Sequence, residues 1–248
     1  ALWGSQDVLM RAVEADGSPS WGGPRVVHPR TGGAAQTEPV VVSDPTDDSY
    51  FLAWTDNRVD DAFNVYVQRY DASGNRLWPR AVRVNELSRV FPDSTAVSLD
   101  PSGHVVVAWV QTSAMRVHVQ KLDRHGNKLW PSDTLIEWSS PIPPALATDS
   151  SGNTFVGWVL WGDSEHADAY LQRIDSEGSL LWAEEVPVNS LPGTADYEPG
   201  DIAIDETSKV IVVWGDSRNG NVDIYAQKFD SSGSRIWAGD IVVSQESD

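Results

Sequence analysis

The stretch DASGNRLW at residues 71–78 decides the fold, because it returns at regular intervals along the chain. It reappears as DRHGNKLW at 123–130, as DSEGSLLW at 175–182 and as DSSGSRIW at 230–237, with a degraded copy, EADGSPSW, at 14–21. Successive final tryptophans lie between 52 and 57 residues apart. A period near fifty residues with β patterning is typical of the blades of a β-propeller.

Each copy has the chemistry of a hairpin. An alternating run such as VYVQRY at 65–70 comes before it and predicts a half-buried strand. The Asp side chain can bond its own backbone two residues on, the Gly tolerates a positive φ, and we expect the Trp to open the next strand. This pattern assigns to turns and core Asp71, Gly74, Trp78, Asp123, Gly126, Trp130, Asp175, Gly178, Trp182, Asp230, Gly233 and Trp237.

A second, more apolar hairpin precedes each of the four good copies. Its runs, such as YFLAW at 50–54 and VVVAW at 105–109, predict strands buried on both faces near the axis of the propeller. The whole chain, 1–248, is therefore predicted to be one all-β propeller domain of about five blades. A partial blade spans residues 7–27. The four complete blades that follow span 38–86, 92–137, 143–188 and 198–246.

The partial blade at 7–27 holds only an outer hairpin. An isolated two-stranded hairpin is marginal in water and an unpaired strand edge invites pairing. We therefore expect another protein subunit, or a neighbouring copy of the chain, to complete this blade. The alternative is a reduced blade whose edge is shielded by Arg11 and Arg25.

Composition excludes several classes of function. The net charge of −18, from 36 acidic and 18 basic residues, repels phosphate backbones, so nucleic acid is not an expected partner. The absence of Cys excludes disulfides, thiol nucleophiles and Cys-ligated metals. No run of about 18 apolar residues predicts membrane insertion. A start at Ala1 without a signal-peptide core suits a processed or excised chain, which we expect outside the cell or at its surface.

Few residues outside the repeat pattern suggest chemistry. Asp56 with Arg58, and Asp216 with Arg218, follow the second strand of their blades. They predict either ion pairs within a blade, Arg58 to Asp61 and Arg218 to Asp223, or a polar ligand site. Trp161 has no counterpart in the other blades, and it is either extra core or a platform for stacking a sugar.

No cofactor is expected from the sequence. The five His show no metal-ligand spacing, and His118 occupies the position that Tyr66 holds in its blade, which favours packing. Ca²⁺ remains open because acidic residues gather in two places, although they lack the spacing of a known calcium loop. These residues are Asp44, Asp47, Asp48, Asp60 and Asp61.

The unit AWxDxR…DIYAQxxDxxGxxxW resembles a repeat of large exported bacterial surface proteins. The fourth blade carries it from Trp214 through Asp216 and Arg218 to Trp237, whereas the second and third blades depart from it after Trp109 and Trp158. The resemblance implies the propeller fold and a surface location. In architecture the chain is also similar to propeller lectins, which carry one Trp-rich repeat per blade.

These observations lead to a ranked expectation of function. The first is a non-catalytic extracellular module, a structural or interaction subunit of a bacterial surface assembly such as a filament, pilus-like appendage or adhesin. The second is a carbohydrate-binding propeller lectin, and the third a glycan-cleaving propeller enzyme. Because no nucleophile, base or metal set is visible, we expect no hydrolase activity. A lectin should repeat a polar and aromatic cluster in at least two clefts between blades, and an enzyme should show one carboxylate cluster.

Overall fold

The computed structural model describes residues 7–28, 35–59, 62–86, 90, 95–111, 116–136, 143–163 and 166–244. All regular structure in these ranges is β-strand. No helix that could cross a membrane occurs in them.

Four antiparallel blades follow one another along the chain, each built as a meander of four strands. The first holds β3 (Gln36–Asp44), β4 (Ser49–Val59), β5 (Ala62–Tyr70) and β6 (Val82–Arg83). The second holds β7 (Ala96–Leu99), β8 (Val105–Gln111), β9 (Arg116–Leu122) and β10 (Thr134–Ile136). The third holds β11 (Ala145–Thr148), β12 (Thr154–Asp163), β13 (His166–Ile174) and β14 (Val186–Pro187). The fourth holds β15 (Ala195–Ile204), β16 (Val210–Asp216), β17 (Asp223–Phe229) and β18 (Ile241–Ser244).

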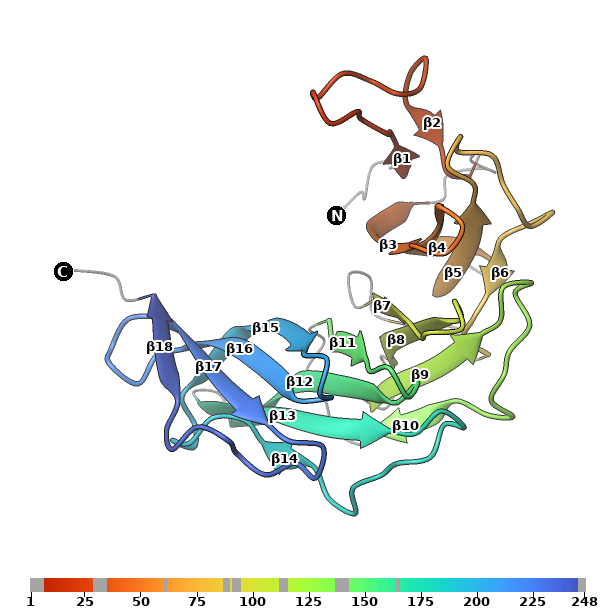
Figure 1. Cartoon of the computed structure of the whole chain (residues 1–248). Helices are drawn as coiled ribbons and strands as arrows, with labels where there is room; N and C mark the ends of the chain where they lie inside the picture. The colour runs from red at the N-terminus through yellow and green to blue at the C-terminus, as the bar shows by residue number, and fades with distance from the viewer. Residues whose placement is uncertain are drawn as a thin grey trace.

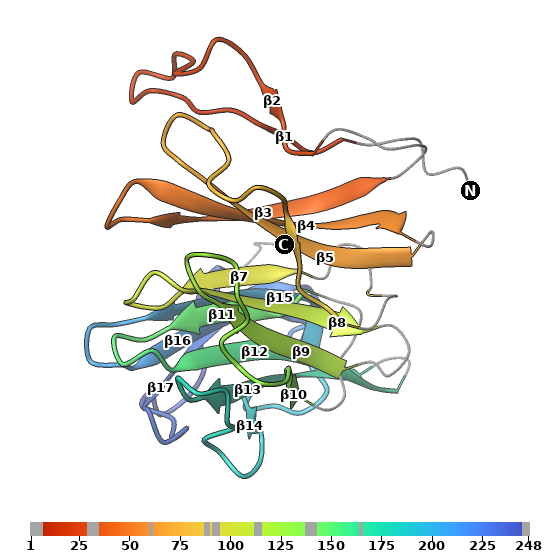
Figure 2. The ribbon, with the colours of Figure 1, turned by 90° about the vertical axis from the view of Figure 1, so that its right-hand side faces the viewer.

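The blades stand side by side along an arc (Figure 1). Their first strands, β3, β7, β11 and β15, line the concave side, and each contacts the first strand of the next blade. A two-stranded hairpin of β1 (Leu9–Met10) and β2 (Arg25–Val26) stands at one end of the arc, apart from the fourth blade at the other (Figures 1 and 2). The predicted fold, four complete blades and an N-terminal partial blade, is confirmed.

The third and fourth blades are linked through the main chain, and Val90 makes a similar link between the first two, donating to the Phe63 carbonyl at 3.1 Å and bridging to Gln111. A single residue pair, Ala167 with Ala195, links β13 to β15, so that their strands form one continuous sheet. The first two blades form separate sheets.

Burial differs from the expectation at two strands. β8 is buried throughout, as its apolar run predicts. In β3, Val40 and Val42 pack toward the second blade, but Val41 between them is exposed because it faces the groove beside the N-terminal hairpin. Conversely, β5 was expected to be half-buried, yet it is buried over most of its length because both of its faces pack against neighbouring elements.

We expected the repeated tryptophans to open the last strand of each blade, and this expectation is wrong. They lie in a bend before it, and their indole N–H groups reach across to the next blade. Trp78 donates to the Arg124 carbonyl at 2.8 Å, and Trp130 donates to that of Ser176 at 3.0 Å. The same bond joins Trp182 to Ser231 and, from the N-terminal hairpin, Trp21 to Ala72, both at 3.3 Å. Every acceptor is the residue after the first residue of the DxxG turn.

The glycine of that turn meets two demands. Gly178 has a φ of +94°, which disfavours any residue with a Cβ. A Cβ on it would also lie 2.6 Å from the Trp130 ring of the preceding blade. The turn therefore offers a flat backbone surface on which the indole rests and a carbonyl to which it bonds.

We predict that Trp130→Phe lowers the free energy of unfolding by about 2 kcal/mol, because it removes the hydrogen bond between blades and part of a buried ring. Trp237→Phe is the matched control: no acceptor for the Trp237 indole is found among the described residues, and we expect a change within about 0.5 kcal/mol. Urea unfolding of both variants measures the difference. Equal losses would show that the contact between blades is not the source of the stability.

A second row of aspartates binds the inner turns to the third strands. Asp100 lies 3.2 Å from Lys121, Asp149 lies 2.9 Å from Arg173, and Asp205 lies 2.8 Å from Lys228. Burial raises the pKa of Asp149, but hydrogen bonds from Arg173 and Asn153 outweigh it and hold that pKa below its usual range. The carboxylate therefore stabilises the fold only while it is ionised.

Asp149→Asn should destabilise the chain by about 3 kcal/mol at pH 7, because the buried Arg173 loses its counter-charge. In the parent, this stabilisation is complete above the unfolded pKa of about 3.9 and is lost as the pH falls through the lower folded value. Unfolding free energies at pH 7, 5 and 3 should thus fall less steeply with acid in the variant. The exposed variant Glu177→Gln is the control. If the unfolding free energy of Asp149→Asn falls with pH as steeply as that of Glu177→Gln, this account is contradicted.

Candidate functional site

Asp56 and Arg58 form a closed unit at the end of β4. The buried Asp56 carboxylate accepts hydrogen bonds from the Trp54 indole at 3.4 Å, from the Arg58 backbone N–H at 2.8 Å and from the Arg58 guanidinium. The guanidinium carbon also lies 4.2 Å from the centre of the Tyr66 ring. The arginine is therefore paired with its own neighbour, while Asp61 lies outside the described residues.

Asp216 and Arg218 repeat this unit in the fourth blade. Asp216 accepts from the Trp214 indole at 3.0 Å and from Arg218, which also bonds Asp240 at 2.9 Å and covers the Tyr225 ring. Burial raises the pKa of Asp216, but the bonds from Arg218 and Trp214 outweigh it and hold the pKa below its usual range. The partners of Arg218 are thus Asp216 and Asp240.

Trp161 belongs to a different part of the molecule. It lies half-buried on β12 and packs against the apolar cluster shared by the third and fourth blades. The candidate residues therefore occupy three blades, and the structure brings together only the two members of each pair, Asp56 with Arg58 and Asp216 with Arg218.

The aspartates of the repeated turns act locally. Each accepts the backbone N–H four residues on: Asp71 from Asn75 at 2.8 Å, and Asp123 from Asn127 at 2.8 Å. Asp175 and Asp230 do the same with Ser179 and Ser234.

Two of the three calcium candidates that the structure describes are paired with cations of the protein, and the third, Asp48, is exposed. Asp44 bonds the Arg124 guanidinium, and Asp47 bonds Arg69 at 2.6 Å. Over the described ranges, no group of three or more His, Asp or Glu side chains is placed to hold a metal ion. Asp60 and Asp61 lie outside those ranges.

An open pocket of about 190 Å³ lies where the first and second blades meet. Its wall consists of Asn85, Glu86, Trp109, Gln111, His118, Asp133 and Leu135. Trp109 pairs with His118 across the strands, just as Trp214 pairs with Tyr225 in the fourth blade. By the same register Gln111 corresponds to Asp216 and Asp133 to Asp240. The pocket thus stands at the place that Arg218 fills in the fourth blade.

The pocket contains a buried donor that lacks an acceptor. The Trp109 side chain is fully buried, and its indole N–H has no hydrogen-bond partner among the described residues. In the first and fourth blades the corresponding indoles donate to Asp56 and Asp216. An unpaired buried donor costs about 1–3 kcal/mol, so a ligand oxygen here would remove a penalty.

Trp158 of the third blade is also without a partner among the described residues, but the cavity beside it is different. That cavity measures about 10 Å³ and holds at most one water molecule. Among the described residues, the pocket at Trp109 has room for a ligand and the cavity beside Trp158 does not.

Two carboxylates from different blades flank the pocket. The Lys128 ammonium lies 3.3 Å from Glu86 and 3.8 Å from Asp133, so their nearest oxygens are at most about 7 Å apart. Asp133 is held further by the Gln120 amide at 3.1 Å and lies 3.4 Å from the His118 ring. Glycosidases use carboxylate pairs about 5–9.5 Å apart, so the spacing is compatible with such chemistry.

Sequence reasoning missed this pocket because Glu86 and Asp133 belong to different repeats and form no motif. A signal was nevertheless present. The second blade replaces the repeat's Asp by Gln111 and its Tyr by His118. Those two departures remove the residues that elsewhere hold the arginine in place.

Comparisons with known proteins place the fold. No family model matches the sequence, and no curated protein matches it. An α-L-arabinanase from Penicillium chrysogenum, complexed with arabinobiose, matches with a TM-score of 0.59 at 11% identity, over 84% of this chain and 66% of that one. A protein of unknown function from Dyadobacter fermentans gives 0.53 at 10%, over 80% and 66%. An endo-arabinase from Bacteroides thetaiotaomicron gives 0.50 at 12%, over 84% and 81%.

The chain spans 66% of the length of the first two of these structures. Identities of 10–12% show a shared propeller fold and nothing finer.

The expected function is corrected by these comparisons. We expected a non-catalytic structural subunit and no enzyme, but arabinanases, an α-L-arabinofuranosidase and a β-1,3-galactosidase recur among the structures that share the fold. The missing catalytic motif was a poor argument, because a propeller assembles its sites from separate blades.

Proposed function

We propose that this chain acts on glycans and cleaves a glycosidic bond in the pocket between its first and second blades. The observation that carries the proposal is the open pocket itself, with two carboxylates at its wall and the buried, unpartnered Trp109 N–H beside it. The glycan-cleaving propellers that share the fold support the class of reaction.

The polar groups of the pocket suit a ligand rich in hydroxyl groups. A sugar hydroxyl both donates and accepts, and the pocket has a donor beside it in Trp109 and acceptors at its wall in the Asp133 and Glu86 carboxylates. Gln111 supplies both kinds of group. A ligand with only one kind of group would leave part of this set unpaired.

The two carboxylates suggest separate roles. Asp133, half-buried and held by Gln120, has the fixed position that a nucleophile or a general base requires. Glu86, exposed at the rim, is placed to protonate the leaving glycosidic oxygen. His118 lies against the Trp109 ring and beside Asp133, so we assign it a positioning role.

A repeated lectin site finds less support. A lectin would repeat the pocket in several blades, but Arg58 lies over Tyr66 and fills this place in the first blade, and Arg218 lies over Tyr225 and fills it in the fourth.

The acidic, Cys-free composition supports a place of action outside the cell.

We expect turnover when the chain is incubated with a panel of arabino- and galacto-oligosaccharides. Glu86→Gln and Asp133→Asn should each reduce kcat/KM about 100-fold or more, because each removes one of two carboxylates needed in the transition state. Product analysis by chromatography measures this, with the exposed Glu177→Gln as control. Saturable binding without turnover would point to a lectin instead. The absence of both binding and turnover would refute the proposal.

Trp109→Phe separates ligand binding from folding. Both Trp109 and Trp54 are fully buried, so Phe at either position removes the same part of a ring, but the Trp109 N–H bonds no described residue; Trp109→Phe should therefore lower the unfolding free energy by about 1 kcal/mol less than Trp54→Phe. A bound sugar would lose one hydrogen bond, so KM or Kd should rise about 5- to 10-fold. Trp54→Phe, whose N–H donates to Asp56, should show the opposite pattern, with lower stability and unchanged affinity. Unchanged affinity in Trp109→Phe would show that the indole N–H does not contact the ligand.

A further inference from the structure

The N-terminal hairpin is the outer half of a blade whose inner half is missing from the described chain. The Val27 N–H donates to the Val8 carbonyl at 2.9 Å, as Val84 does to Val65 and Val188 to Ala169 in complete blades. β1 is thus a third strand. Complete blades pair that strand on both sides, whereas β1 pairs only with β2 among the described residues.

The residues of β1 are exposed where their counterparts are buried. Leu9 is 55% exposed and Val13 63%, whereas the corresponding Tyr66 and Tyr70 of the first blade are 6% and 1% exposed. Apolar side chains at these positions are buried or half-buried wherever the inner strands are present. The exposure therefore marks the place of a missing strand pair.

A large apolar groove lies beside β1. It measures about 550 Å³, and the hairpin and the first blade form its two walls. Leu9 and Trp21 come from the hairpin, and Val41, Tyr50 and Leu52 from the first blade. Between two complete blades, the inner strands of one blade pack against the face of the next at this position.

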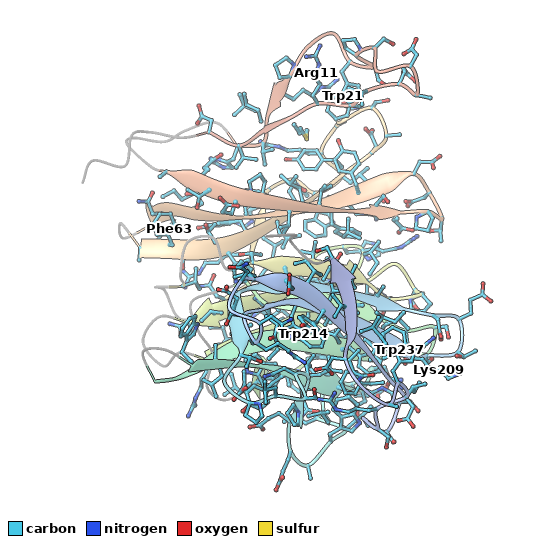
Figure 3. The ribbon with its side chains drawn as sticks, turned by 90° about the vertical axis from the view of Figure 1, so that its left-hand side faces the viewer. Arg11, Trp21, Phe63, Lys209, Trp214 and Trp237 are labelled. Carbon is cyan, nitrogen blue, oxygen red and sulfur yellow. The ribbon has the colours of Figure 1, made fainter. Side chains whose placement is uncertain are left out.

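The fourth blade exposes the matching face at the other end of the arc. Val243 is 59% exposed, whereas the corresponding Val84 of the first blade is fully buried, and Ile224 and Ile241 are exposed too. Trp237 is the one repeated tryptophan whose indole bonds no next blade within the described chain. Figure 3 looks at this side of the molecule and shows Trp21 on the hairpin and Trp237 on the fourth blade.

We infer that a β-hairpin with the repeat's inner-half pattern, supplied by a partner polypeptide, completes the N-terminal partial blade at residues 7–27. One strand of it pairs with the free edge of β1 through main-chain hydrogen bonds, and its two apolar faces cover the groove and the exposed face of the fourth blade. A second copy of the chain is not the occupant, because its inner hairpins are already built into folded blades. Arg25 does not shield the edge, since it bonds the Gly74 carbonyl and stacks on Trp21.

The test uses a synthetic peptide that copies residues 36–58, an inner hairpin of this chain. We expect saturable 1:1 binding by calorimetry and at least about tenfold slower hydrogen exchange at the amides of residues 9–13. A scrambled peptide should do neither. The double variant Leu9→Lys with Val41→Lys, both at exposed positions, should keep the parent's melting temperature and bind the peptide at least about tenfold more weakly.

Three results would overturn the inference. The double variant could bind as well as the parent, which would place the peptide elsewhere. The amides of residues 9–13 could already be protected in a monomer without peptide. The chain could form a dimer that protects these amides, which would make a second copy the occupant. Glu86→Gln should bind the peptide normally, so a failure here is distinct from a failure of the proposed activity.

Discussion

The hydrogen bond from a tryptophan to the turn of the next blade is the interaction on which the arc depends. Four times an indole N–H donates to the second residue of a DxxG turn. Because the bond spans two blades, it sets how far one is rotated from the next. The turn needs glycine both for its positive φ and for the close approach of the indole ring. The glycine and the tryptophan of the repeat are therefore the two sides of one contact between blades.

The candidate site follows from a local failure of the same regularity. In the first and fourth blades an aspartate, an arginine and a tyrosine fill the space at the end of the second strand. The second blade keeps the tryptophan but replaces the aspartate by Gln111 and the tyrosine by His118. The scaffold is unchanged, and a space that is packed elsewhere becomes a pocket with an unpaired donor.

Sequence alone predicted the fold because its evidence is periodic: a fifty-residue spacing and a glycine in each turn are visible without coordinates. It could not place the tryptophans, since nothing local distinguishes a residue that opens a strand from one that reaches the next blade. It also missed the pocket, because Glu86 and Asp133 meet only when two blades are side by side. The function was misjudged for the same reason, since the search was for motifs within one segment.

The pairing of Ala167 with Ala195 has a consequence for how the chain comes apart. Because this bridge makes the third and fourth blades one sheet, they share main-chain hydrogen bonds as well as packing. Val90 links the first and second blades in the same way, since its N–H donates to the Phe63 carbonyl and it bridges to Gln111. Local opening in a linear array follows its weakest junctions. The first and second blades, and likewise the third and fourth, should therefore each open as a cooperative pair.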